Sequence, residues 1–203
     1  MQIVSARGGP RLQQDVLGGI VTSYDLRYSA TCRPGPPGGS PVLLRPAHLL
    51  GGSAMTEVMS PLSGQAIGLA SVPDPVFSGA MVGPGTAIDP VREPSEAVSP
   101  VAGVVVSLHP HAFVVVDEAG RGVLTHLGVD TVQLNGEGFE LLVRKGDTVA
   151  QGQPVVRWDP SAVETAGKSP VCPVVALEAV ADQLSGVRED GDVAAGQPLF
   201  SWH

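Results

Sequence analysis

Short apolar runs, rich in valine and separated by turn-forming residues, recur through most of this sequence. From residue 56 onward, Gly, Pro, Asp or Asn interrupts these runs about every 8 to 15 residues, a spacing typical of sandwiches and barrels. Aromatic residues make up only 4% of the chain, so the core must be largely aliphatic. The pattern predicts an all-β fold, a β-sandwich or barrel-sandwich hybrid of short antiparallel strands. The runs expected to be strands are 66–70, 81–88, 104–106, 113–117, 123–127, 141–143, 155–158, 171–177 and 199–202.

One or two short helices are expected among these strands. After Pro160, the pair Ser161 and Glu164 has the spacing of a capping box, and Gly167 supplies a stop signal. A second piece, residues 177–184, has apolar residues at helical spacing and is also expected to be helical.

The first 54 residues differ from the rest in charge and in amino-acid composition. Five arginines and two aspartates give residues 1–54 a net charge of +3, and because the whole chain carries −8, residues 55–203 carry −11. The Pro- and Gly-rich run 34–39 opposes regular structure. We therefore expect residues 1–54 to be a disordered or non-native N-terminal extension and residues 55–203 to be the functional domain.

The charge and the apolar pattern also limit the partners. A net charge of −8 argues against binding to a nucleic-acid backbone. No apolar run approaches the roughly 18 residues of a membrane span, and no signal peptide opens the sequence. A soluble cytoplasmic protein is the expectation.

Two segments near the C-terminus repeat one pattern. Residues 145–155 and 190–199 each contain a Gly-Asp pair, a β-branched residue and a second glycine before the next apolar run. This internal repeat predicts a barrel built from related hairpins. The same pattern marks lipoyl and biotin carrier domains, so it indicates architecture and not activity.

Two histidines stand where such a fold would bring them together. His126 lies in the apolar run 123–127, with Asp130 four residues later, and His111 precedes the run 114–116. If the two runs form a hairpin, both imidazoles lie near the same end of adjacent strands. Such a site suits a transferable phosphoryl group or a divalent metal.

The two chemistries make different demands. Phosphoryl transfer needs one neutral imidazole as nucleophile and a second that donates to the phosphoryl oxygens. A hydrolytic zinc site needs three protein ligands, an open position and a general base. His109 could be a third ligand, but alternate residues of a strand face opposite ways, which counts against His109 and His111 acting together.

Residues 57–202 resemble a known family, the glucose-type IIA component (EIIA) of the phosphoenolpyruvate-dependent sugar phosphotransferase system. The most specific block is Thr-His-Leu-Gly-Val-Asp-Thr-Val-x-Leu-x-Gly-x-Gly-Phe at 125–139. The other matching blocks, in the family's order, are Ser-Pro-Leu-Ser-Gly at 60–64, Val-Pro-Asp-Pro-Val-Phe at 72–77, Gly-Pro-Gly-Thr-Ala-Ile at 83–88, Ser-Pro-Val-Ala-Gly at 99–103, His-Ala-Phe at 111–113 and Lys-Ser-Pro at 168–170.

The resemblance implies roles for particular residues. His126 would be phosphorylated, at Nε2, and His111 would be the accessory imidazole. The residues implied in partner docking are the apolar Val76, Phe77 and Val82 and the acidic Asp74 and Asp130. The chain would then be a phosphotransferase that acts through a phosphohistidine and needs no cofactor.

The resemblance also implies partners. Phosphorylated HPr would be the donor, and the acceptor would be a cysteine on the IIB domain of a sugar-specific membrane permease. The protein would lie in the cytoplasm, peripheral to the membrane through that permease. Regulatory protein targets, controlled by the phosphorylation state of His126, are compatible with this function.

Two departures and two alternatives stay open. His109 stands where many members have threonine, which leaves open what orients His111, and Thr125 stands where an aliphatic residue is usual.

The alternatives are a zinc-dependent peptidase-like domain with ligands from His109, His111 and His126, and a biotinyl- or lipoyl-like carrier. A non-essential zinc ion at His111 and His126 is also possible. Cys172 is expected to be a small buried residue, and His109 a strand-end residue and not a ligand.

Overall fold

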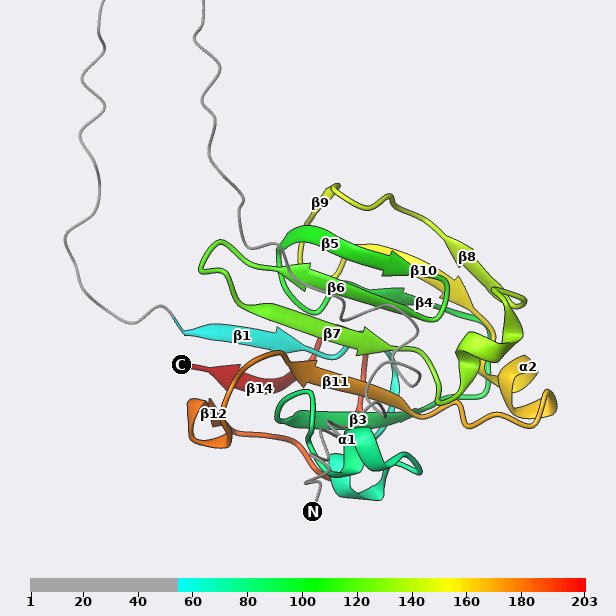
Figure 1. Cartoon of the computed structure of the whole chain (residues 1–203), viewed down its shortest axis with the longest axis horizontal. Coiled ribbons are helices and arrows are strands. Elements are labelled where there is room, and N and C mark those ends of the chain that lie inside the picture. Colours follow the sequence, from blue (N-terminus) through cyan, green and yellow to red (C-terminus); the bar gives the residue numbers. More distant parts are fainter. Residues whose placement is uncertain (1–54) are drawn as a thin grey trace, which may run out of the picture. The chain divides into compact units, whose positions relative to one another are not determined.

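The computed structural model describes residues 55–203, so the expectations for residues 1–54 lie outside it. In this range, antiparallel strands form three sheets. The largest has the order β13-β2-β3-β11-β7-β6-β5-β9, and the two smaller ones are β1-β14-β12 and β4-β10-β8. Figure 1 shows β6, β7 and β11 side by side through the middle of the domain. The all-β prediction is confirmed.

The elements have the following bounds. The strands are β1 (Thr56–Met59), β2 (Gly64–Gly68), β3 (Gly85–Pro90), β4 (Ser95–Val98), β5 (Gly103–His109), β6 (Ala112–Val116), β7 (Gly122–His126), β8 (Phe139–Leu141), β9 (Thr148–Val149), β10 (Pro154–Trp158), β11 (Cys172–Ala176), β12 (Leu184–Ser185), β13 (Asp192–Val193) and β14 (Pro198–Trp202). The helices are α1 (Pro75–Ser78) and α2 (Pro160–Thr165), and the 3-10 helices are η2 (Leu69–Ser71), η3 (Thr131–Leu134) and η4 (Ala181–Gln183).

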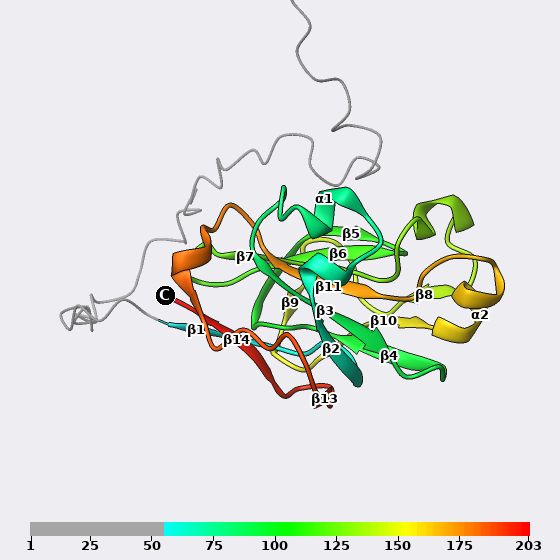
Figure 2. The same cartoon turned by 90° about the horizontal axis from the view of Figure 1, so that it is seen from below.

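Alternation along β7 separates the core from the outer face of the large sheet. Val123 belongs to the main hydrophobic cluster, which it shares with Phe113 and Val115 of β6. Because successive side chains of a strand point to opposite faces, Leu124 and His126 point away from this cluster. Figure 2 shows α1 on that other side, beside β7 and β11 and opposite β4, β10 and β14.

The predicted strands are present, with shifted ends. The run expected at 141–143 overlaps β8 only at Leu141. Two others also differ. Residues 81–88 were expected to form one strand, but β3 begins only at Gly85, because Gly83 has a left-handed φ of 138° that breaks the extended backbone. The run expected at 66–70 is β2, which ends at Gly68 and continues as η2. Strands β1, β4, β9, β12 and β13 were not predicted.

The two α-helices begin in the same way. Helix α2 is where it was expected, but its N-cap is Asp159 and not Ser161: Asp159 Oδ1 accepts hydrogen bonds from the backbone N–H groups of Ser161 (2.9 Å) and Ala162 (3.3 Å). The expected capping box is therefore wrong. Helix α1, which was not predicted, begins with Asp74 as N-cap and Pro75 in its first turn. An Asp-Pro pair starts both helices, because proline is favoured in the first turn and aspartate satisfies free N–H groups.

The helix expected at 177–184 is absent. Glu178 adopts a left-handed φ of 60°, which interrupts any helix at its second residue. The segment instead contains the three-residue η4 and then enters β12, which pairs with β14. Two of its apolar residues, Ala179 and Leu184, pack against the main hydrophobic cluster.

The predicted repeat extends over the whole domain. In the first copy β9 pairs with β5, and in the second β13 pairs with β2. The backbone N–H of Ser99 donates to Gln153 O (2.8 Å), and that of Ser60 donates to Gln197 O (2.7 Å). Each half thus uses a Ser-Pro turn to hold the loop of its Gly-Asp hairpin. The two halves are related by an approximate two-fold repeat.

One side chain breaks this repeat. Gln151 Nε2 donates to the backbone oxygens of Glu57 (2.8 Å) and Pro100 (3.1 Å), which ties the first loop to the opposite half. The matching residue in the second loop is Ala195, whose side chain has no donor. A pocket of ≈ 240 Å³ is lined there by Ala195 and Glu96, among others.

We therefore expect Ala195→Gln to stabilise the domain by up to about 1 kcal/mol, the net value of a hydrogen bond. The new amide would reach the carbonyls of Pro61 and Glu96, which match those that Gln151 uses. The matched variant Gln151→Ala should lower the free energy of unfolding by about the same amount. Urea denaturation measures both. A destabilised Ala195→Gln variant would show that the repeat does not extend to this contact.

Candidate functional site

The β6–β7 hairpin brings the two predicted histidines together. Ala112 pairs with His126, and the backbone N–H of Leu127 donates to His111 O (2.7 Å). His126 is thus the last residue of β7, and His111 is the residue just before β6. Their ring centroids lie 5.3 Å apart, with the planes at 59°. The juxtaposition predicted from the hairpin is confirmed.

A backbone carbonyl holds the His126 ring. His126 Nδ1 lies 2.6 Å from Gly128 O. A carbonyl oxygen can only accept, so Nδ1 carries the proton and Nε2 keeps a free lone pair. Gly128 can present this carbonyl because it adopts a left-handed φ of +80° in a crowded loop, where an added Cβ would lie 2.5 Å from Thr131 Cγ2.

Helix α1 supplies the third ring of the site. Phe77 packs edge-on against His126, with centroids 5.3 Å apart and planes at 62°. The helix that carries Phe77 has only four residues, and the Asp74 side chain holds its start by accepting from the N–H groups of Val76 (2.8 Å) and Phe77 (3.2 Å). Asp74 therefore supports the geometry around His126 through α1.

Both histidines are buried and neutral at physiological pH. Only 4% of His126 and 6% of His111 is exposed. Burial, together with the smaller effect of the neighbouring imidazoles His126 and His109, lowers the pKa of His111 to about 4. Burial also lowers the pKa of His126, and the Gly128 carbonyl and the negative charges of Asp74 and Asp130 oppose this only in part. A neutral imidazole with a free Nε2 is the form required of a nucleophile.

These shifts predict how stability depends on pH. Below its usual value of 6.5, an unfolded His111 takes up a proton that the folded form does not bind until about pH 4. The unfolded state thus binds more protons in this interval, so the free energy of unfolding should fall as the pH is lowered through it and stay level above it. Thermal unfolding at several pH values measures this. The decline should be smaller in His111→Gln, and an equal decline in both proteins would contradict the assignment.

A third imidazole lies next to this pair. The ring of His109, the last residue of β5, lies 5.8 Å from that of His111, with planes at 32°. The argument that alternate residues face opposite ways is wrong here, because Pro110 and His111 form the turn of the β5–β6 hairpin and are not strand residues. The prediction that His109 ends a strand is confirmed.

Comparison with known proteins identifies the family. The family model described as "phosphoenolpyruvate-dependent sugar phosphotransferase system, EIIA 1" matches residues 56–181. The chain belongs to this family.

Individual EIIA relatives agree with this assignment. The glucose-specific EIIA component of Staphylococcus aureus strain Mu50 is 41% identical over 58% of this chain and 71% of its own length. The N-acetylglucosamine-specific EIICBA component of Escherichia coli K12 is 36% identical over 72% of this chain, which spans only 23% of that relative. The solved glucose permease IIA from Mycoplasma capricolum superposes with a TM-score of 0.68 at 32% identity, covering 73% of this chain and 96% of its own.

The predicted docking residues of this EIIA domain differ in exposure. Phe77 is 2% exposed and Val76 is also buried, Val82 and Asp74 are half-buried, and Asp130 is exposed. Phe77 therefore offers a partner little surface and serves mainly to pack against His126. The exposed apolar side chains on the flanking elements are Met81 (58%), just after α1, and Val132 (37%), in η3, neither of which sequence reasoning selected.

Two further residues flagged in the sequence lie beneath the site. Thr125 is fully buried, and its hydroxyl has no hydrogen-bond partner in the described domain. It points to the core side of β7 beside Phe113, with which it pairs, where an aliphatic residue would fit equally well. Cys172 is fully buried, as predicted, and burial raises the pKa of its thiol.

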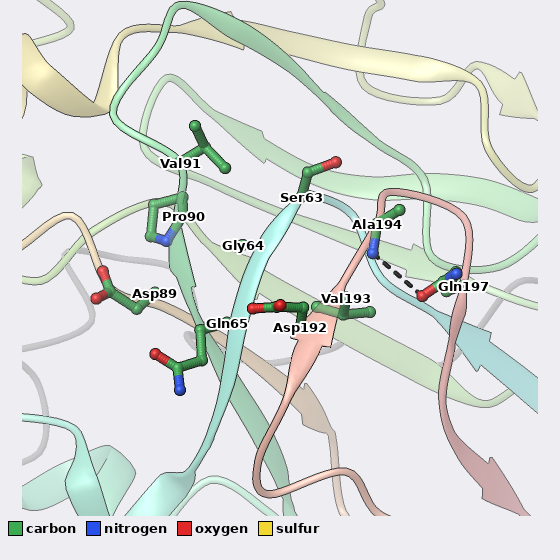
Figure 3. A pocket seen from close by; sticks show the side chains of 10 residues that line it. All are labelled: Ser63, Gly64, Gln65, Asp89, Pro90, Val91, Asp192, Val193, Ala194 and Gln197. Atoms are coloured by element: carbon green, nitrogen blue, oxygen red, sulfur yellow. Dashed lines mark hydrogen bonds between the residues drawn. The ribbon is translucent and has the colours of Figure 1, made fainter.

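The rest of the described domain offers little support for a metal centre. Within residues 55–203, no group of three or more His, Cys, Asp and Glu side chains is close enough to hold a metal ion. A pocket of ≈ 610 Å³ lies where β2, β13 and the end of β3 meet; its lining includes Gln65, Asp89 and Asp192 but neither histidine of the pair (Figure 3). No helix in the described range is long and apolar enough to cross a membrane.

Proposed function

We propose that this EIIA domain carries a phosphoryl group on His126 Nε2, receiving it from phosphorylated HPr and passing it to a cysteine of a IIB domain during sugar uptake. The observation that carries the proposal is the hydrogen bond from His126 Nδ1 to Gly128 O (2.6 Å) beside a second neutral imidazole. The family and the glucose-specific names of its relatives support this assignment.

The position of the proton on the His126 ring supports Nε2 as the reacting atom. The Nε2 lone pair attacks phosphorus, the P–N bond to the donor histidine breaks, and the proton on Nδ1 stays where it is. The ring then bears a positive charge, and the Gly128 carbonyl stabilises it through the same hydrogen bond. No proton has to be moved to or from solvent for the step to occur.

His111 is suited to guide the phosphoryl group. Negative charge on the phosphoryl oxygens must be stabilised while the group moves between two nitrogens, and a neutral imidazole can donate one N–H for this purpose. The ring of His111 lies 5.3 Å from that of His126 and makes no side-chain hydrogen bond within the described domain. Its N–H is therefore available to the phosphoryl group.

The charges around the site favour a weakly held phosphate. The ammonium of Lys168 donates to Gln133 Oε1 (2.7 Å), and Arg92 and Arg157 form their ion pairs with carboxylates away from the two histidines. The neighbouring Asp74 and Asp130 are acidic. Such a site does not trap its phosphate, and positive charge would come from the partners, which acidic flanks would attract through charge complementarity.

The docking surface follows from the exposed residues. The apolar part comprises Val82, Met81 and Val132 on the elements next to the histidines, with Val76 and Phe77 as the buried support beneath, and Asp74 and Asp130 are the acidic part. An apolar patch with acidic flanks suits fast and weak association with basic partners.

No cofactor is required for the reaction, and zinc at His111 and His126 would be an incidental ligand.

Reconstituting the relay tests the proposal. The protein is mixed with phosphoenolpyruvate, the first enzyme of the system and HPr, and the protein-bound phosphate is then measured. We expect about one phosphate per chain that is labile in acid and stable in base, as phosphohistidine is, and that is lost when a IIB domain is added. Absence of label, or label that survives acid, would refute the proposal.

A further inference from the structure

The ring of His111 is not held in the way the ring of His126 is. His126 has a fixed proton position because Nδ1 donates to Gly128 O. His111 has its backbone fixed, by the bond from Leu127 N to His111 O, but its side chain makes no hydrogen bond in residues 55–203. A neutral imidazole carries one proton, which can lie on either nitrogen. Without a further partner, His111 would present an N–H to the phosphoryl group only part of the time.

Among the described residues, His109 is a polar side chain whose ring lies beside that of His111. The described ring contacts join His111 to His126 at 5.3 Å and to His109 at 5.8 Å, and none joins His109 directly to His126. The three imidazoles thus form a row with His111 in the middle. His126 and His109 are also the two rings that lower the pKa of His111.

The turn that carries these rings is rigid. Pro110 fixes its own φ and lies against the Asn135-Gly136 turn, so close that a Cβ added at Gly136 would lie 3.2 Å from Pro110 Cγ. His109 pairs with Ala112 across the hairpin, and His111 is tied to β7. The backbone therefore keeps the two rings together, and the His109 side chain is only half-buried.

We propose that His109 is a positioning residue for His111. Its N–H donates to the His111 nitrogen remote from His126, which keeps the His111 proton on the nitrogen that faces the phosphoryl group. A direct bond needs ring centroids about 5.2 Å apart, since each nitrogen lies about 1.1 Å from its ring centre and the two nitrogens about 3.0 Å from each other. The observed 5.8 Å is slightly longer, as hydrogen bonds of unliganded sites often are before the complex forms.

Three variants test the inference: His109→Phe and His109→Leu, which lack a donor, and His109→Gln, which keeps one. The first measurement is the ¹⁵N chemical shifts of the His111 ring in the unphosphorylated protein. In wild type and His109→Gln, one nitrogen should show the protonated and the other the unprotonated shift. In the Phe and Leu variants, the two shifts should move toward each other. A merely structural role of His109 would not change them in this way.

The second measurement is the rate at which phosphorylated protein discharges to HPr, and it rests on the proposed function. We expect at least a tenfold slower rate in the Phe and Leu variants and a rate within threefold of wild type in His109→Gln. Unchanged ¹⁵N shifts, or discharge within twofold of wild type in both donor-free variants, would overturn the inference. If the wild type accepts no phosphate but the shifts respond as expected, the proposed function fails and the positioning by His109 stands.

Discussion

In a His126→Gln variant, acceptance of phosphate from phosphorylated HPr is expected to fall to background, whereas a His111→Gln variant still becomes labelled but discharges about 100-fold more slowly. His126 supplies the attacking lone pair, and glutamine cannot replace it. His111 only stabilises charge on the phosphoryl group in flight, so its loss slows transfer in both directions without removing the acceptor. With excess donor and minutes of reaction, labelling of His111→Gln should still reach completion.

Rapid mixing with labelled phospho-HPr measures acceptance, and mixing the purified phosphoprotein with unlabelled HPr measures discharge. His203, the last residue of the sequence, provides a control. Its ring contacts Ser185, which is not part of the site. A His203→Gln variant should behave as wild type in both measurements. Stoichiometric labelling of His126→Gln would show that another residue accepts the phosphate.

The second large effect is expected at Gly128. An alanine there would have to adopt a φ of +80° with its Cβ 2.5 Å from Thr131 Cγ2 and 2.8 Å from Ser169 O. We expect Gly128→Ala to lower the free energy of unfolding by about 2 to 4 kcal/mol, since the left-handed conformation and the overlap both add cost. The displaced carbonyl would also release His126 Nδ1, so acceptance of phosphate should slow in the molecules that remain folded.

Gly152 offers a matched control for this variant. It has nearly the same φ, +79°, but an added Cβ would meet nothing within 4 Å. Gly152→Ala should therefore cost only the conformational term, about 1 to 2 kcal/mol, and leave phosphoryl acceptance unchanged. Equal losses of stability in the two variants, measured by urea denaturation, would mean that the loop after β7 is not crowded around Gly128.

Much of this fold could be predicted because its strand centres are apolar. The runs 113–117 and 123–127 match β6 and β7 to within one residue at each end, because valine is favoured on a half-buried pleated surface. Strands β9 and β13 were missed because two residues are too few to show a period. Helix α1 was missed although Asp74-Pro75 carries the same start signal as Asp159-Pro160, because four residues show no helical repeat.

The site was predictable where it depends on strand pairing and not where it depends on turns. The proximity of His111 and His126 followed from the lengths of the two arms of one hairpin. The contact between His109 and His111 did not, because sequence alone does not show that Pro110 and His111 form a tight turn and are not part of a strand. The roles of the Gly128 carbonyl and of Phe77 likewise depend on backbone geometry, which a list of residue types does not contain.

The most direct test of the central claim is to identify the nitrogen that bears phosphate. The protein, labelled with ¹⁵N in its histidines and phosphorylated through HPr, is examined for ³¹P–¹⁵N coupling. We predict coupling to Nε2 of His126, with Nδ1 still protonated and hydrogen-bonded to Gly128 O. Coupling to Nδ1, or to a nitrogen of His111 or His109, would contradict the account.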